Sequence, residues 1–238
     1  DAFRLSIHGI HGAHDLKIFK DNVKDGDNVV DLGANIGYFT LILAKLVGPT
    51  GKVFAFEPDP RNLALLKKNV ECNNYKNVII VPKAVSDVND KCTLYVGQKT
   101  FGQNRIYKPK KTKNQNYIPM KSETIRLDDF FKTNNLLNKI SFIKMDIEGA
   151  EFLALSGMKE ILKLNKNIKI FTEAEISYLE DAGSSYDQFI DLLTENDFTF
   201  SLADNRTETL TKVNKSQLEK ILNDEGSVNI FCVRELNS

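Results

Sequence analysis

Short apolar runs alternate with amphipathic stretches over most of the chain. The first run covers 28–32, and an apolar helix is expected from 38 to about 47. The sequence Gly-Pro-Thr-Gly at 48–51 ends this helix, because proline cannot continue it and glycine turns freely. A second strand is expected over 52–57, with a second helix from Pro60. This alternation predicts βαβ units around a parallel sheet.

The same pattern continues toward the end of the chain. It predicts further strands at 78–81, 92–96, 117–120, 140–146, 168–173, 198–202 and 228–233. It predicts further helices near 127–131, from 151 to about 164, near 186–193 and at 216–222. No internal repeat or linker-like change of composition interrupts the series. We therefore expect one α/β domain over 27–238, preceded by an N-terminal cap segment and helix over 1–26.

Composition places the chain among ordinary folded proteins. Of its 238 residues, 42% are apolar and 27% are charged, which excludes a disordered or collagen-like chain. Lys plus Arg equals Asp plus Glu at 32 each, so no overall field favours nucleic acid. The three cysteines lack CxxC spacing and fit a reducing compartment. No apolar run approaches the roughly 18 residues of a membrane helix. We expect a cytoplasmic protein without a nucleic-acid or membrane partner.

The turn after the first strand is the first candidate site. It reads Asp31-Leu32-Gly33-Ala34-Asn35-Ile36-Gly37, and the first strand-to-helix turn of a doubly wound sheet touches the ligand. Gly33 permits a tight turn, and Gly37 permits close approach of helix and strand. Asn35 stands where a dinucleotide fingerprint needs glycine against the pyrophosphate, which disfavours NAD. S-adenosylmethionine lacks phosphate, and Asp31 with the backbone of the turn can meet its methionine end.

Glu57 is the second candidate, at the end of the second predicted strand. It lies near the roughly 20-residue spacing from the glycine turn at which an acid reaches a ribose diol. A carboxylate that accepts from both hydroxyls forms two charge-assisted hydrogen bonds and repels a 2′-phosphate. A glycine turn with an unrelated surface acid is the weaker interpretation, because turn, spacing and strand position agree. The sequence thus predicts S-adenosylmethionine as the cofactor.

Five segments together resemble the FkbM-type S-adenosylmethionine-dependent methyltransferases. They are VDLGANIGY (30–38), VFAFEPDP (53–60), AVSD (84–87), LD (127–128) and IKMDIEGAE (143–151). The resemblance implies a class I methyltransferase fold, a doubly wound, Rossmann-like α/β domain with a seven-stranded, mostly parallel sheet whose last strand is antiparallel. It also implies O-methylation of a hydroxyl on a sugar, polyketide or other small acceptor. By position it implies cofactor contacts from Asp31, Gly33, Ala34, Asn35, Gly37, Tyr38, Glu57 and Pro58, with Ala84 and Val85 beside the adenine.

Three acids are the candidates for catalysis. Methyl transfer to a hydroxyl needs an in-line arrangement and a group that removes the proton. Asp146 ends a predicted core strand, Glu148 follows it directly, and Glu173 ends the next strand, so crowding should raise at least one pKa. We predict these three as catalytic residues, with Asp146 also able to contact the cofactor. Glu151 also fits a helix N-terminus, and Lys144 fits either a buried ion pair or an acceptor contact.

A long polar stretch between 96 and 117 is the candidate acceptor loop. At about twenty residues it is longer than most structureless connections. It can place Gln103, Asn104, Arg105 and Tyr107 over the acceptor side of the mouth, where such groups suit a polyhydroxylated or anionic acceptor. A disordered surface loop is the alternative. No complete set of metal ligands is visible, so no metal is expected.

The sequence therefore predicts an S-adenosylmethionine-dependent O-methyltransferase with a small-molecule or glycan-type acceptor. A non-catalytic S-adenosylmethionine-binding regulatory module is the alternative from another class. The acids at 146–148 and 173 favour an enzyme, since binding alone needs only the first half of the sheet. Asn35 disfavours an NAD-dependent oxidoreductase, and zero net charge disfavours an RNA methyltransferase. The sequence assigns neither the acceptor nor an oligomeric state.

Overall fold

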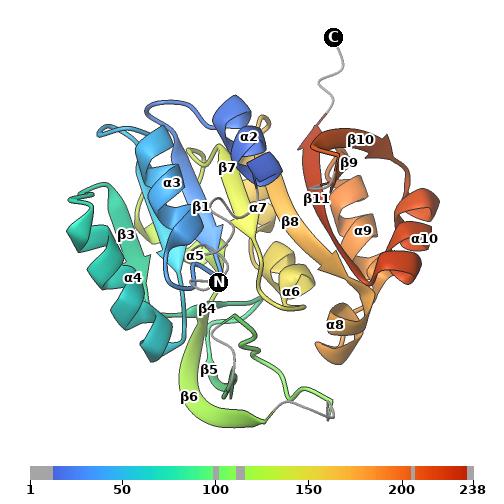
Figure 1. The fold of residues 1–238 in the computed structure, drawn as a ribbon, viewed down its shortest axis with the longest axis horizontal. Helices are drawn as coiled ribbons and strands as arrows, with labels where there is room; N and C mark the ends of the chain where they lie inside the picture. Colours follow the sequence, from blue (N-terminus) through green and yellow to red (C-terminus); the bar gives the residue numbers. More distant parts are fainter. Residues whose placement is uncertain (1–12, 99–101, 111–115, 205–206, 235–238) are drawn as a thin grey trace.

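The structure is a computed structural model that describes residues 13–98, 102–110, 116–204 and 207–234. Residues 1–12 of the expected cap segment lie outside this description. The main sheet in the described part consists of β10 (Thr209–Val213), β9 (Phe198–Asp204), β11 (Ser227–Arg234), β8 (Lys169–Glu175), β7 (Phe142–Met145), β1 (Asn28–Leu32), β2 (Lys52–Phe56) and β3 (Val78–Val81), in this spatial order (Figure 1).

The seven strands expected in the main sheet are all present, and most of them are parallel. β11 pairs antiparallel with β8 on one side and with β9 on the other. This confirms the mostly parallel, doubly wound sheet with an antiparallel last strand. The edge strand β10 was not expected, because its short, exposed and largely polar sequence lacks the apolar run of a core strand.

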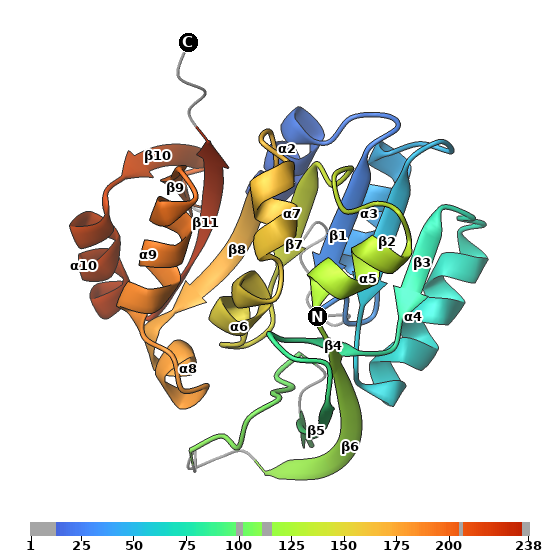
Figure 2. The same ribbon diagram turned by 180° about the vertical axis from the view of Figure 1, so that it is seen from behind.

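Helices cover both faces of the main sheet. They are α2 (Ala13–Asn22), α3 (Tyr38–Leu46), α4 (Pro60–Cys72), α5 (Leu127–Thr133), α6 (Glu151–Ser156), α7 (Lys159–Leu164), α8 (Ile176–Asp181), α9 (Tyr186–Glu195) and α10 (Lys215–Glu225). α2 and α3 lie in front of the sheet in Figure 1, whereas α5 and α7 lie in front of it in the reverse view of Figure 2.

Neighbouring residues of one strand face the two sides of the core. Val29 of β1 packs in the cluster that contains Phe19 of α2 and Leu43 of α3. Val30, the next residue, packs in the larger cluster that contains residues of α5, α7 and α9. Because successive side chains of a strand alternate, a fully buried strand such as β1 needs apolar residues at consecutive positions.

The helix expected from 151 to about 164 is divided in two. α6 ends at Ser156, and α7 begins at Lys159, with Gly157 and Met158 between them. A Cβ on Gly157 would collide with the carbonyl oxygen of Ser86, and the Gly157 carbonyl accepts from the Asp128 amide. The prediction of a single helix is therefore wrong. The helix is interrupted at Gly157, where the backbone packs closely against the segments that contain Ser86 and Asp128.

A second, three-stranded sheet lies below the carboxyl ends of the parallel strands in Figure 1. It contains β4 (Ala84–Val85), β6 (Tyr117–Ile125) and β5 (Lys91–Gly97), in this order. The strands expected at 92–96 and 117–120 are present as β5 and β6, and they form an antiparallel ribbon that the sequence did not predict. Because Gly97 pairs with Tyr117, the long polar connection between them leaves and returns at one end of this ribbon.

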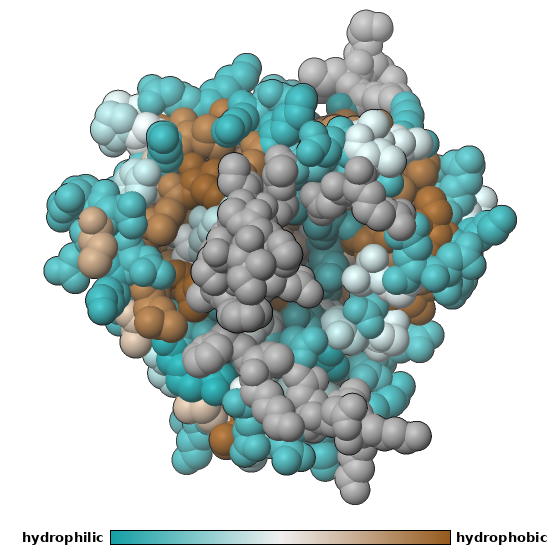
Figure 3. All heavy atoms as spheres, in the orientation of Figure 1, coloured by the Kyte–Doolittle hydropathy of each residue, from teal (hydrophilic) through white to brown (hydrophobic). Residues whose placement is uncertain are grey.

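The described helices include none that is both long and apolar enough to cross a membrane. The rim of the visible face is mostly hydrophilic (Figure 3). Large hydrophobic side chains that remain exposed are scattered, among them Leu65 on α4 and Leu164 on α7.

Candidate active site

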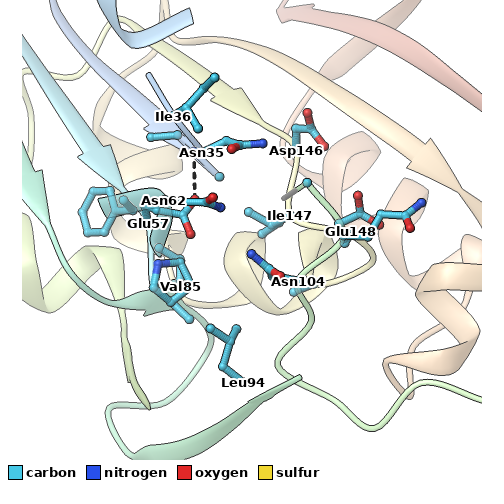
Figure 4. Close-up of a pocket in the computed structure, with 18 of the residues that line it drawn as sticks. Asn35, Ile36, Glu57, Asn62, Val85, Leu94, Asn104, Asp146, Ile147 and Glu148 are labelled. Atoms are coloured by element: carbon cyan, nitrogen blue, oxygen red, sulfur yellow. Dashed lines mark hydrogen bonds between the residues drawn. The ribbon is translucent and has the colours of Figure 1, made fainter. Parts of the chain in front are cut away.

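A cavity of about 760 Å³ opens at the carboxyl ends of β1, β2 and β7. Figure 4 shows Asn35 and Glu57 on one side of it and Asp146 and Glu148 on the other. Of the predicted site residues, the cavity is lined by Gly33, Ala34, Asn35, Tyr38, Glu57, Pro58, Ala84, Val85, Asn104, Asp146, Glu148 and Glu173. The fold therefore brings both halves of the predicted site to one opening, and the volume suits a drug-sized ligand.

The glycine turn is held between β2 and β7. The amides of Gly33 and Ala34 both donate to the Phe56 carbonyl at the end of β2, at 3.1 and 3.0 Å. Gly33 has φ 75° and Asn35 has φ 50°, both in the left-handed region. Gly37, with φ 96°, precedes α3, and a Cβ there would meet Leu66 of α4. Gly37 is not in the cavity wall, so its contribution is close packing of α3 against α4.

Glu57 is fixed by backbone donors at the mouth of β2. Its carboxylate accepts from the Asn35 amide at 2.8 Å and from the Asp59 amide at 2.9 Å, and the residue is 4% exposed. Burial raises its pKa to about 7, although both backbone hydrogen bonds act in the opposite direction. Each carboxylate oxygen has a second lone pair, so Glu57 can still accept from a ribose diol.

Sequence reasoning missed several lining residues. Two of them are polar, namely Lys83 and Asn62, and Asn62 is 1% exposed on α4 and hydrogen bonds to Glu57. Its signal in the sequence was a polar residue four positions before Leu66, on the buried face of a helix. Leu94 and Ile147 are apolar and reach the cavity from β5 and from the turn after β7. Nothing in their local sequence distinguishes them from core residues.

Asp31 does not line the cavity and lies behind its wall. It is fully buried, accepts from the Thr40 hydroxyl at 2.6 Å, and lies 3.4 Å from Lys144 Nζ. Lys144 also lies 3.6 Å from an oxygen of Asp146 and donates to the Gly33 carbonyl. The sequence left two roles for Lys144, and the structure shows the buried ion pair. Lys144 also lines the cavity, so its contact with an acceptor stays a prediction. A direct cofactor contact for Asp31 stays a prediction.

Carboxylates from two strand ends crowd the other side of the cavity. Burial, reinforced by Asp146, raises the pKa of Glu148 to about 8 and moves that of Glu173 in the same direction. Glu151 accepts from the Ile147 amide at 3.0 Å, and burial raises its pKa to about 7. Its place in the first turn of α6 agrees with the helix N-terminus interpretation. Groups with raised pKa values beside a cavity are suited to proton transfer near neutral pH.

The described part of the polar connection, 102–110, crosses the same mouth. Asn104 lines the cavity, but its amide is engaged: it accepts from the Gly97 amide at 3.3 Å and donates to Asp59 at 3.0 Å. Arg105 and Tyr107 are not in the cavity wall and contact Glu148 instead. Gln103 and Ile106 complete this wall. In the described residues no group of three or more His, Cys, Asp or Glu is placed to hold a metal ion.

Fold and site together define a class I S-adenosylmethionine-dependent methyltransferase. Residues 31–200 match the family described as the methyltransferase FkbM domain, and the chain belongs to this family. The match includes the glycine turn, Glu57, and the acids after β7 and in β8. The cofactor fits the residues present, because the cavity combines backbone groups at the turn, the buried carboxyl group of Glu57, and apolar walls at Val85 and Leu94.

Similar proteins agree with this assignment. "Methyltransferase 1" of Beauveria bassiana is 27% identical over 179 residues, which cover 67% of this chain and 70% of that protein. A SAM-dependent O-methyltransferase of Thermotoga maritima has a similar fold, with a TM-score of 0.52, 15% identity, and coverage of 100% of this chain and 71% of that one. A Streptococcus mutans protein solved in complex with S-adenosylhomocysteine (SAH) also has a similar fold, with a TM-score of 0.51 and 13% identity. The alignment covers 94% of this chain and 96% of that one.

Proposed function

We propose that this methyltransferase methylates a hydroxyl group of a small, polyhydroxylated acceptor, of the sugar or glycan type. The observation that carries the proposal is the group formed by Asp146, Glu148 and Glu173 in the cavity wall. A hydroxyl is a poor nucleophile until its proton is removed, and a positioned carboxylate with a pKa near the working pH does this well. When bound, S-adenosylmethionine supplies an electrophilic methyl group on a sulfonium.

In the proposed reaction, one side of the cavity binds the cofactor and the other side binds and activates the acceptor. On the first side, the backbone of the glycine turn would hold the methionine end, Glu57 the ribose, and Ala84 with Val85 the adenine. On the second side, Glu148 or Glu173 would take the proton of the acceptor hydroxyl, and Asp146 would orient the acceptor or the cofactor. Both sides open into one cavity, so the acceptor and the methyl donor can meet there.

The charge of the mouth supports a neutral acceptor over an anionic one. Asp146, together with Glu148 and Glu173 in their ionised forms, repels phosphate and carboxylate groups, and the same repulsion disfavours RNA. Glu173 also lines a second cavity of about 210 Å³, where Ser227, Asn229 and Asp204 add polar groups. An acceptor larger than one sugar unit could extend past Glu173 into this space.

We also propose that the protein is cytoplasmic, which the free thiols of Cys72, Cys92 and Cys232 support.

A methyl-transfer assay tests the proposal. The wild type is incubated with methyl-labelled S-adenosylmethionine and a panel of neutral saccharides, uronic acids and structured RNA. We expect label in a base-stable methyl ether of a neutral saccharide. Glu148→Gln or Glu173→Gln should lower turnover by about 100-fold or more if the residue takes the proton, with cofactor affinity largely kept. Asp146→Asn should also lower turnover, because it disturbs the orientation of the acceptor or the cofactor.

Glu71→Gln is the matched control, because Glu71 is exposed on α4, away from the cavity lining. It should leave turnover unchanged. Label recovered only in RNA or as a base-labile ester would contradict the proposed acceptor. Near-wild-type turnover in all three acid variants would remove the carboxylates from the mechanism.

A further inference from the structure

The segment 102–110 is attached to the turn after β7 and to α8. Its Arg105 exchanges two backbone hydrogen bonds with Tyr95 of β5, at 3.0 and 2.7 Å. The Tyr107 hydroxyl donates to the Glu148 carbonyl, and Lys110 Nζ lies 2.8 Å from Asp181 of α8. These contacts fix the segment across the mouth of the cavity, so the side chains between them have defined neighbours.

Arg105 places a buried positive charge at this mouth. The residue is 3% exposed, and one of its terminal nitrogens lies 3.5 Å from Glu148 Oε2. Its guanidinium carbon lies 3.9 Å from the centre of the Tyr178 ring, a cation–π contact. A buried guanidinium is costly unless it is paired, and here its pairing partner is an acid of the cavity wall.

The turn that carries Glu148 is shaped for this contact. Glu148 has φ 57°, which is strained for a residue other than glycine, and Gly149 follows with φ 102°. A Cβ on Gly149 would collide with the Tyr178 carbonyl and the Tyr107 hydroxyl. The strained backbone directs Glu148 between the cavity and Arg105. Glu148 lines the cavity, whereas Arg105 does not, so Arg105 can act on a small acceptor through Glu148.

We propose that Arg105 is a positioning residue of the acceptor site, which holds the Glu148 carboxylate at the cavity and stabilises its charged form for proton removal. This inference rests on the proposed role of Glu148. Among the described residues, the groups that interact electrostatically with Glu148 include Asp146 and Glu151 from its own turn and α6, Glu173 from β8, Tyr178 from α8, Tyr117 from β6, and Tyr107 with Arg105 from the crossing segment.

Within this group Arg105 is the one positive charge, and every other member is an acid or a phenol. Burial and Asp146 favour the protonated form of Glu148, and Arg105 opposes them. An opposite charge within about 4–6 Å typically lowers the pKa of an acid by about 1–3 units. Loss of Arg105 therefore leaves no positive charge in this group to oppose burial and Asp146.

The test measures the pKa of Glu148 directly, in the whole protein with SAH present. Carboxyl ¹³C NMR of glutamate-labelled protein follows the titration, and Glu148→Gln assigns the signal. We expect Arg105→Met to raise the pKa of Glu148 by about one unit or more. Arg105→Lys should restore much of the difference, because it returns the charge. Lys108→Ala removes an exposed positive charge from the same segment and should leave the titration unchanged.

An unchanged Glu148 titration in folded Arg105→Met, with folding verified by circular dichroism, would overturn the proposal. If Arg105→Met fails to fold, Arg105→Gln makes the same comparison with a polar, uncharged side chain. With an acceptor from the assay above, the pH midpoint of kcat should also rise in Arg105→Met. A higher acceptor KM with an unchanged midpoint would instead assign Arg105 to direct acceptor contact. The NMR titration requires no methyl transfer, so it remains decisive if the proposed acceptor class is wrong.

Discussion

Gly33 brings the turn after β1 against the end of β7. It has φ 75°, and a Cβ at this position would overlap the carbonyl oxygen of Asp146. Both the backbone angle and the missing side chain are therefore needed, since only glycine satisfies them together. The site depends on this approach, because the turn and Asp146 line the same cavity.

We predict that Gly33→Ala destabilises the protein more than Gly183→Ala does. Gly183 has φ 87° with nothing within 4 Å of its would-be Cβ, so its substitution measures the cost of the backbone angle alone. That cost is about 1–2 kcal/mol. Gly33→Ala should add the cost of the clash, as measured by urea denaturation of both variants. Equal losses of stability would show that the turn moves away from β7 without penalty.

At the scale of elements, the ends of β7 and β8 bring like charges together. The sheet register places these parallel strands side by side, with Met145 opposite Thr172, so the acids that follow must share one opening. Burial and the neighbouring Asp146 raise the pKa of Glu173 above its ordinary value. The folded state then holds this proton more tightly than the unfolded state does.

We predict that Glu173→Gln becomes more favourable to stability as the pH rises. A raised folded-state pKa gives stability that is present at low pH and is lost once the unfolded chain releases its proton, above about pH 4.3. Gln cannot titrate, so the stability of the variant relative to wild type should increase between pH 5 and pH 8.5. Urea denaturation at both pH values measures it, with Glu71→Gln as control. A difference that does not depend on pH would show that Glu173 carries no such proton.

At the scale of the whole molecule, cofactor binding should stabilise the fold, because the cavity is built from both halves of the sheet. At 100 times its Kd a ligand adds about 2.7 kcal/mol. For a chain of this size the melting temperature should then rise by roughly 5–11 °C. Glu57→Ala should reduce the rise that S-adenosylmethionine or SAH causes at a fixed concentration, since it removes the acceptor for the ribose.

The rise should also be larger at pH 8 than at pH 6. The pKa of Glu57 is about 7, and its ionised form is the better acceptor of hydroxyl hydrogens. Thermal melts with and without the cofactor at the two pH values measure this. An equal shift from NAD, or an unchanged shift in Glu57→Ala, would contradict the way we place the cofactor.

The sequence by itself determined the features that local chemistry controls. Apolar runs with regular spacing predicted the seven main strands, because burial on both faces of a parallel sheet requires them. The glycine turn and Glu57 were found from their spacing, since a tight turn and a ribose contact each need particular residue types. The polar edge strand β10 and the break at Gly157 were missed, because their local sequence does not record which segments they meet.

Only the tertiary structure decided which partner each charged side chain has. Asp31, behind the cavity, pairs with Lys144 of the cavity wall, and Arg105 contacts Glu148 rather than lining the cavity. Asn62 reaches Glu57 from the buried face of a helix whose pattern suggested only packing. The two ion pairs join segments far apart in the sequence, and a buried charge takes whichever partner the fold brings within a few ångströms. Composition and spacing limit the residue types at a site, but the packing of β7, α8 and the segment 102–110 sets their roles.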